Sequence, residues 1–350
     1  MVKSRRLFLI TLILMGLLLS TAVAITGCGD TTTTTAATTT AAKDNSTVIG
    51  DRALKVLTSN LTTGDYPNNT ISGTALATKL GDATQAAQLY VLDIRAKADY
   101  DKGHIKGATQ VDFAQWAAPD NLNKLPKDKK IIVVCYTGNT AAQTASGLRM
   151  LGFDAAVLKA GMNGWTKSTA TDQVVADLNA ANNPVLTTPA GTSTPAPAAT
   201  TFAKPSDSDY TVLAETANKV TSAMQTSGDY ANYTVSAANL MTKLGGADKG
   251  SLFVLDIRKT DDFNNGHIEG ATHVDFGAVA VPDNLKMLPK NKKIVVVCYT
   301  GNTAAQTTEI LNMLGYDAVV LKYGMMGWNG PGKDAYITDI QNAANPVVTG

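Results

Sequence analysis

The sequence contains two long stretches that are nearly identical to each other. Residues 119–144, PDNLNKLPKDKKIIVVCYTGNTAAQT, recur at residues 282–307 as PDNLKMLPKNKKIVVVCYTGNTAAQT. The offset of 163 residues holds without a gap from Val91 through Trp165 and their counterparts. A repeat of this length indicates a duplicated domain rather than a solenoid of short repeats. The 350-residue chain can therefore hold two domains, each with its own buried core.

Each copy alternates predicted strands with a predicted helix. Short apolar runs typical of buried parallel strands occupy residues 89–93, 131–135 and 155–158 of the first copy. Residues 140–151 carry apolar side chains on one face and precede Gly152, which predicts a helix capped by Thr140. We therefore expect the α/β class, with two tandem domains, each a parallel sheet flanked by helices. Ligands of such sheets bind beyond the carboxyl ends of the strands.

Two segments of low complexity separate the folded parts. Residues 29–45, rich in Thr and Ala, predict a flexible tether, and residues 187–206, rich in Pro, Thr and Ala, predict an extended linker. The domains are expected at residues 46–186, with a core at about 71–170, and at residues 207–350, with a core at about 235–333. The net charge of +1 supplies no basic face, so nucleic acid is not an expected partner.

The N-terminus predicts an export signal. Lys3, Arg5 and Arg6 precede an apolar run at residues 7–19, and small residues then lead to Cys28. The end of this segment resembles a bacterial lipobox, which implies a signal peptide at residues 1–28, lipidation of Cys28 and a lipid anchor in the cell membrane. The alternative is an uncleaved membrane anchor. Both interpretations place the globular part on the extracytoplasmic face.

The loop CYTGNT, which starts at Cys135 and again at Cys298, is the candidate reactive site. Gly138 permits an unusual backbone geometry, and successive amides in such a turn can form an anion-binding nest at the positive end of the next helix. A cysteine at this position loses its proton more readily, and its thiolate is a nucleophile. The alternative is a buried structural cysteine. The string CYTGNTAAQT is identical in both copies, whereas the following positions, expected on the surface, differ, which favours the reactive thiol.

Other residue types restrict the chemistry further. The chain has three cysteines, one in each copy and Cys28, so no disulfide framework is expected. Its three histidines and widely spaced cysteines predict no metal site and no cofactor. Two charged pairs at predicted strand ends could steer an anion, although a structural role is favoured: Asp93 with Arg95, and Asp256 with Arg258. A structural role is also favoured for His104, His267, Trp165 and Trp328.

Four motifs occur in the same order in both copies: VLDIR, GHIKGA or GHIEGA, the six-residue cysteine loop entering a helix, and LKAGMNGW or LKYGMMGW. This combination resembles the rhodanese family. The resemblance implies a sulfurtransferase, in which the loop cysteine attacks a sulfane sulfur donor such as thiosulfate or polysulfide. The cysteine becomes a persulfide and passes the sulfur to a thiophilic acceptor such as cyanide or a thiol. The implied nucleophiles are Cys135 and Cys298, and the implied persulfide cradles are Tyr136, Thr137, Gly138, Asn139 and Thr140, and Tyr299, Thr300, Gly301, Asn302 and Thr303.

Two departures from relatives of this kind limit the expectation. The loops lack the cation that many thiosulfate-using members carry, which leaves the preferred donor open. Ala141 and Ala304 stand where phosphatases on the same scaffold carry a phosphate-clamping arginine, so phosphatase activity is not expected. Two alternatives to a sulfurtransferase stay open. One is a sulfur carrier or docking module for a membrane partner without turnover, and the other is thiol redox chemistry between Cys135 and Cys298.

Overall fold

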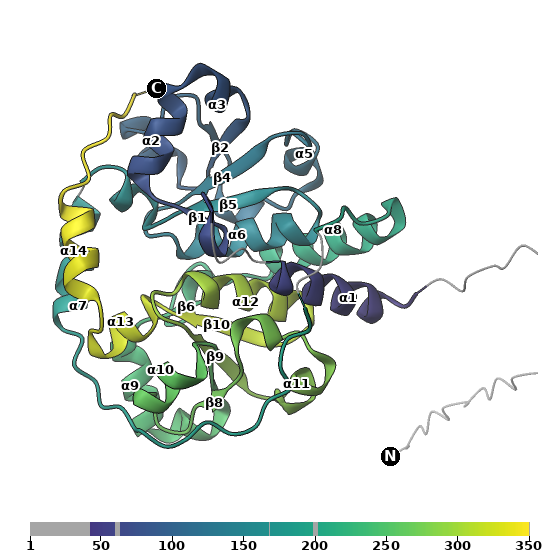
Figure 1. The fold of residues 1–350 in the computed structure, drawn as a ribbon, viewed down its shortest axis with the longest axis vertical. Coiled ribbons are helices and arrows are strands. Elements are labelled where there is room, and N and C mark those ends of the chain that lie inside the picture. Colours follow the sequence, from purple (N-terminus) through teal and green to yellow (C-terminus); the bar gives the residue numbers. More distant parts are fainter. Residues whose placement is uncertain (1–42, 60–63, 168, 199–201, 350) are drawn as a thin grey trace, which may run out of the picture. The chain divides into compact units, whose positions relative to one another are not determined.

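Each repeat folds around a parallel sheet of five strands (Figure 1). The computed structural model describes residues 43–59, 64–167, 169–198 and 202–349. The first sheet has the order β1-β5-β4-β2-β3, and its strands are β1 (Thr70–Ile71), β2 (Leu89–Asp93), β3 (Thr109–Gln110), β4 (Lys130–Val134) and β5 (Ala155–Leu158). The second sheet repeats it as β6-β10-β9-β7-β8, formed by β6 (Thr234–Val235), β7 (Leu252–Asp256), β8 (Thr272–His273), β9 (Lys293–Val297) and β10 (Asp317–Leu321). The α/β prediction is therefore confirmed.

Helices flank both sheets. Those of the first repeat are α1 (Asn45–Thr58), α2 (Gly73–Gly81), α3 (Ala83–Ala87), α4 (Lys97–Lys102), α5 (Pro119–Leu122), α6 (Asn139–Met150) and α7 (Thr169–Asn179). Those of the second are α8 (Asp207–Ser222), α9 (Ala237–Gly245), α10 (Thr260–Asn265), α11 (Pro282–Met287), α12 (Asn302–Met313), α13 (Gly324–Asn329) and α14 (Lys333–Gln341). None of the described helices is long and apolar enough to span a bilayer. The predicted signal peptide, Cys28 and most of the predicted tether lie outside the described residues.

The helix after the cysteine loop begins one residue earlier than predicted. Gly138 is its N-cap, with a left-handed backbone (φ 96°), and α6 starts at Asn139. The prediction that Thr140 caps this helix is therefore wrong, because no side chain caps the helix and Thr140 lies inside it. The left-handed glycine turns the chain sharply enough for the helix to start directly after it.

The two helices α6 and α12 pack against each other between the sheets (Figure 1). Every residue of α6 except Thr140 is buried, as expected for a helix covered on all sides. The Ser146 hydroxyl donates a hydrogen bond of 3.0 Å to the carbonyl of Gln306 across this interface. The variable positions after the CYTGNTAAQT string, predicted to lie on the surface, are buried here, since Ser146 and Glu309 are 0% and 2% exposed. That prediction failed because the helix face turned away from its own sheet contacts the other repeat.

Segments outside each core lie on the opposite core. Helix α1 packs against the short 3₁₀ helix η6 (Phe276–Ala278) of the second repeat, and α8 packs against its counterpart η2 (Phe113–Gln115) in the first. The chain after α7 forms an antiparallel bridge from Leu186 to His267, and the chain after α14 forms one from Val348 to His104. The domain boundaries inferred from the sequence remain predictions, but their outer segments are exchanged between the two cores.

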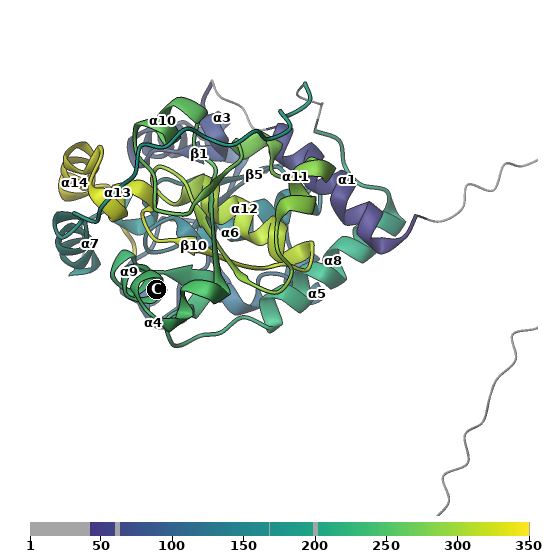
Figure 2. The same ribbon diagram turned by 90° about the horizontal axis from the view of Figure 1, so that it is seen from below.

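Part of the predicted linker is also fixed to the second repeat. The side chain of Asn284 accepts a hydrogen bond of 2.8 Å from the amide of Thr194 and donates one of 2.7 Å to its carbonyl. Helices α7 and α14 lie side by side in both views (Figure 1, Figure 2). They share a small apolar cluster that includes Ala160, Val174, Tyr323 and Tyr336.

Candidate active site

Each candidate nucleophile follows the last residue of a central strand. Cys135 comes directly after β4 and Cys298 directly after β9, so both lie at the carboxyl edge of their sheets. Both are free cysteines and are almost fully buried, with exposed fractions of 1% and 2%. In each loop the glycine amide donates to the sulfur, at 3.0 Å from Gly138 to Cys135 and at 3.1 Å from Gly301 to Cys298.

Hydrogen bonds from a neighbouring turn orient the backbone of each loop. In the first repeat, the Met162 amide donates to the carbonyl of Cys135 at 2.7 Å, and the Asn163 amide donates to the carbonyl of Tyr136 at 3.2 Å. The second repeat repeats both bonds, at 2.8 Å from Met325 and 3.0 Å from Met326. The carbonyl oxygens are held by this turn, whereas the Gly138 amide faces the sulfur. A loop of this kind stabilises negative charge on the sulfur, helped by the N-terminus of α6.

Gly161 allows the turn to approach the cysteine loop closely. It has a left-handed backbone (φ 57°), and an added Cβ would lie 2.3 Å from the carbonyl oxygen of Cys135. Gly324 has the same relationship to Cys298, at 2.2 Å. The glycine of the LKAGMNGW motif therefore has a specific structural function, since any side chain would push the cysteine loop away.

The tyrosine after each cysteine forms the outer edge of the loop. Tyr136 is 38% exposed, and its hydroxyl donates to Asp99 at 2.6 Å; Tyr299 donates to Asp262 at 2.5 Å. Burial of the ring, and then the hydrogen bond to Asp99, raise the pKa of Tyr136 to about 12. The predicted contribution of Tyr136 to the cradle is thus restricted to its backbone, because its side chain is engaged on the outer side.

The two cysteine loops face each other across the interface between the repeats. An added Cβ on Gly301 would lie 2.7 Å from the side-chain oxygen of Asn139, and one on Gly138 would lie 3.1 Å from that of Asn302. Both asparagines are buried, whereas the loop threonines are partly exposed: Thr137, Thr140, Thr300 and Thr303. Sequence reasoning did not find this proximity, because no local signal relates the two loops.

The charged pairs at the strand ends form buried ion pairs. Arg95 binds Asp93 at 2.7 Å, and the Arg95 guanidinium also donates to the carbonyl of Gly103 at 2.8 Å. Arg258 and Asp256 repeat the pair at 2.7 Å. The donors of both arginines are directed at protein oxygens, which agrees with the favoured structural role.

The histidines are also engaged by the protein. The ring of His104 stacks on Tyr100 with centroids 3.7 Å apart, and His267 stacks on Phe263 at the same distance. One ring nitrogen of each histidine lies 2.9 Å from a backbone carbonyl four residues earlier. These contacts agree with the structural role favoured from the sequence.

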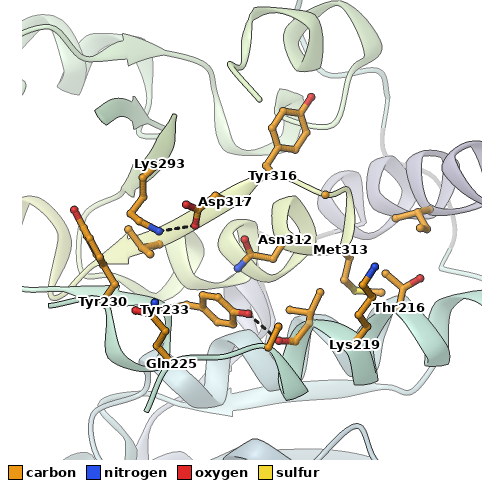
Figure 3. Close-up of a pocket in the computed structure, with 15 residues that line it drawn as sticks. Thr216, Lys219, Gln225, Tyr230, Tyr233, Lys293, Asn312, Met313, Tyr316 and Asp317 are labelled. Carbon is orange, nitrogen blue, oxygen red and sulfur yellow. Dashed lines mark hydrogen bonds and ion pairs between the residues drawn. The ribbon is translucent and has the colours of Figure 1, made fainter. Parts of the chain in front are cut away.

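The described residues contain no cluster of His, Cys, Asp and Glu that could hold a metal ion. A cavity of about 550 Å³ lies at the opposite edge of the second sheet, where Lys293 and Asp317 begin β9 and β10 (Figure 3). Its polar groups are largely bound to the protein, since Lys293 pairs with Asp317 at 2.5 Å and the Tyr233 hydroxyl donates to a backbone carbonyl. The cavity therefore has no part in chemistry at Cys298.

A parallel five-stranded sheet with a cysteine loop at its carboxyl edge, present twice, defines a class of protein. The family model described as "Rhodanese-like domain" matches residues 74–168 and 237–331, together more than half of the chain. The chain belongs to the rhodanese family and contains two of its domains in tandem.

Individual relatives match over about the length of one domain. The chain is 28% identical over 99 residues to "Putative sulfurtransferase YtwF" of Bacillus subtilis, which covers 28% of this chain and 92% of that protein. It is 30% identical over 79 residues to "Thiosulfate sulfurtransferase GlpE" of Tolumonas auensis, covering 22% of this chain and 73% of that protein. A solved rhodanese-like domain protein from Staphylococcus aureus is 28% identical and covers 28% of this chain and 93% of its own, with a TM-score of 0.25. The family and the names of these relatives support a sulfurtransferase-type function.

Proposed function

We propose that this chain is a sulfurtransferase that forms a persulfide on Cys135 and on Cys298. The observation that carries the proposal is the buried sulfur of each cysteine, which accepts an amide hydrogen bond from the loop glycine at 3.0 or 3.1 Å. The neighbouring turn binds the loop carbonyls, so that they do not oppose an anion at the sulfur. This arrangement stabilises a thiolate and then the terminal sulfur of a persulfide.

The transfer takes place in two balanced steps. The cysteine thiolate attacks the sulfane sulfur of the donor, forming a new S–S bond while the donor's S–S bond breaks. With thiosulfate the electron pair leaves on sulfite, and with polysulfide it leaves on the shortened chain. An acceptor thiolate or cyanide then attacks the outer sulfur of the persulfide, and the cysteine departs as a thiolate. No metal or cofactor takes part.

The donor is proposed as a class, namely thiosulfate or polysulfide. Thiosulfate is supported by the name of the Tolumonas auensis relative. Polysulfide is supported by the composition of the loops, which present amides and hydroxyls without a cation for a doubly charged anion. Comparing the rates at which the two donors load the protein decides between them.

Intact-mass measurement tests the proposal directly. The chain from Lys43 onward is incubated with each donor, and each cysteine is expected to gain one sulfur atom, which cyanide removes as thiocyanate. Cys135→Ser and Cys298→Ser should each lose one of the two additions. If no donor modifies the wild-type chain, or if the doubly substituted chain gains the same mass, the proposal is wrong.

The burial of both cysteines favours a second candidate function, a sulfur carrier without turnover. Exposed fractions of 1% and 2% leave the sulfur little contact with solvent, which would protect a stored persulfide from unselective acceptors. A carrier would load one sulfur per cysteine but would release little of it to cyanide or small thiols. Multiple turnovers of thiocyanate formation would exclude this candidate.

We also propose that the protein acts at the extracytoplasmic face of the cell membrane, anchored through lipid on Cys28. The support is the N-terminal pattern of basic residues, an apolar run and a small-residue junction before Cys28. In cells given a fatty acid with a chemical tag, the wild-type chain should incorporate the tag and Cys28→Ala should not. Equal labelling of the two proteins would contradict the anchor.

A further inference from the structure

The two cysteine sites differ at two positions on the interface between the repeats. Tyr323 precedes Gly324 in the second repeat, and its counterpart before Gly161 is Ala160. Tyr336 lies in α14, and its counterpart in α7 is Val174. All four residues belong to one apolar cluster, so the cluster contains two phenol groups from the second repeat and none from the first.

This cluster lies against the loop of Cys135. Ala160 is a member of it, and an added Cβ on Gly138 would lie 3.3 Å from the backbone nitrogen of Ala160. Burial raises the pKa of Tyr323 most, and the charges of Asp177 and the Cys135 thiolate add to this effect. For Tyr336, burial again dominates, followed by Tyr323 and the Cys135 thiolate. Both phenols of the second repeat are thus close to the cysteine of the first, and both remain protonated donors at neutral pH.

The backbone of Tyr323 supports a functional interpretation. It has a left-handed conformation (φ 60°), which is unfavourable for a bulky side chain and which persists where the surrounding structure enforces it. A buried tyrosine hydroxyl normally has a hydrogen-bond partner. Neither Tyr323 nor Tyr336 donates a hydrogen bond from its hydroxyl to another described residue, although both side chains are 8% exposed. Two buried donors beside a nucleophilic sulfur are therefore available to a ligand.

We propose that Tyr323 and Tyr336 complete the Cys135 site from the second domain and donate hydrogen bonds to the anionic sulfur species bound there. This inference rests on the proposed persulfide chemistry. The matching positions in the other half of the chain, Ala160 and Val174, have no donor group. The Cys135 persulfide is consequently the longer-lived of the two, and the site loads faster with a charged sulfane donor than the Cys298 site does.

The test compares single-cysteine chains that are otherwise complete. Cys298→Ser retains only the Cys135 site, and Cys135→Ser retains only the Cys298 site. Each is loaded with polysulfide, freed of donor, and followed by intact mass as the persulfide decays in a fixed concentration of thiol. We expect the persulfide on Cys135 to last about tenfold longer, since a hydrogen bond to a charged group contributes at least that factor.

Phenylalanine substitutions identify the donors. In the Cys298→Ser chain, Tyr323→Phe or Tyr336→Phe should shorten the lifetime of the Cys135 persulfide several-fold, whereas in the Cys135→Ser chain neither should change the lifetime of the Cys298 persulfide. Tyr316→Phe is the matched control, because the Tyr316 hydroxyl donates to the carbonyl of Leu285 and its pKa is raised by burial alone. A purely structural role for the tyrosines would shift thermal stability without this difference between the two sites.

Three outcomes separate the inference from the proposal on which it rests. If neither cysteine gains sulfur from any donor, the proposed function itself is wrong. If both sites load but show equal lifetimes, and the phenylalanine variants match the control, the inference about the tyrosines is wrong while the proposed function stands. The comparison of the two serine variants needs no tyrosine substitution, so it decides the matter even if a phenylalanine variant fails to fold.

Discussion

The indole nitrogen of Trp165 donates a hydrogen bond of 2.9 Å to the carbonyl of Pro346, 181 residues further along the chain. Trp328 makes the equivalent bond of 2.9 Å to Pro184. Each tryptophan lies at the end of one core and binds the terminal arm of the other repeat. The two domains are therefore joined by reciprocal exchange of their arms as well as by the contact between α6 and α12.

Removing the C-terminal arm should destabilise the protein. A chain that ends at Asn342 loses the bond from Trp165 and the bridge between His104 and Val348. We expect its melting temperature to fall by at least about 5 °C, since each lost bond contributes about 1 kcal/mol and 1 kcal/mol corresponds to a few degrees in a chain of this size. A chain that ends at Val348 keeps these bonds and serves as the control. Equal melting of all three chains in calorimetry would show that the arm does not stabilise the fold.

Gly161→Ala should inactivate one cysteine selectively. Its Cβ would lie 2.3 Å from the carbonyl oxygen of Cys135, so the loop must move away from its amide-bonded position. Loading of Cys135 with sulfur should fall at least tenfold, and loading of Cys298 should stay unchanged. The control is Gly107→Ala, because Gly107 also has a positive φ (81°) but faces open space. Intact mass after proteolysis reports each site; equal loading of Cys135 in the two variants would refute the prediction.

Breaking the buried ion pair of the first domain should destabilise it strongly. Arg95→Met leaves the Asp93 carboxylate, whose side chain is 1% exposed, without its cation. We expect a loss of roughly 3–5 kcal/mol in the free energy of unfolding, of which the double variant with Asp93→Asn regains a part. Urea denaturation measures both. At temperatures where Arg95→Met stays folded, thiosulfate should load Cys135 at the wild-type rate; a specific loss of loading would instead indicate that Arg95 steers the donor.

Glu309 should make the stability of the protein depend on pH. Its side chain is buried at the contact of α6 and α12, its Oε1 has no hydrogen-bond partner among the described residues, and burial raises its pKa to about 8. The unfolded chain releases this proton near pH 4.3, so between that pH and about 8 the folded state binds more protons and stability falls as pH rises.

Glu309→Gln removes this titration. The variant should be more stable than the wild type at pH 8, by at least about 1 kcal/mol, and the difference should shrink at pH 5, where the folded wild type already keeps Glu309 protonated. Urea midpoints at the two pH values measure the effect. A wild type that is more stable at pH 8 than at pH 5 relative to the variant would contradict it.

Much of each domain follows from local sequence. Runs such as residues 131–134 alternate with a helical stretch, and this pattern predicted the strands and the position of Cys135 at their carboxyl edge. The repeat then predicted the same arrangement around Cys298. Local geometry was less certain: the sequence suggested a cap at Thr140, whereas the left-handed Gly138 starts the helix by itself. The difference is one residue, because glycine and threonine both favour helix starts and only the backbone conformation distinguishes them.

The relationships between the two copies depended on tertiary structure alone. Glu309 was expected on the surface because its position varies between the copies, yet it is buried where the two domains meet. Tyr323 and Tyr336 carry no sequence signal that relates them to Cys135. Such contacts join residues more than 150 positions apart, and their energies arise from packing between whole domains rather than from local periodicity. The sequence by itself determined two copies of an α/β domain, each with a reactive cysteine loop, and the packing of one copy on the other decided that the two cysteine sites differ.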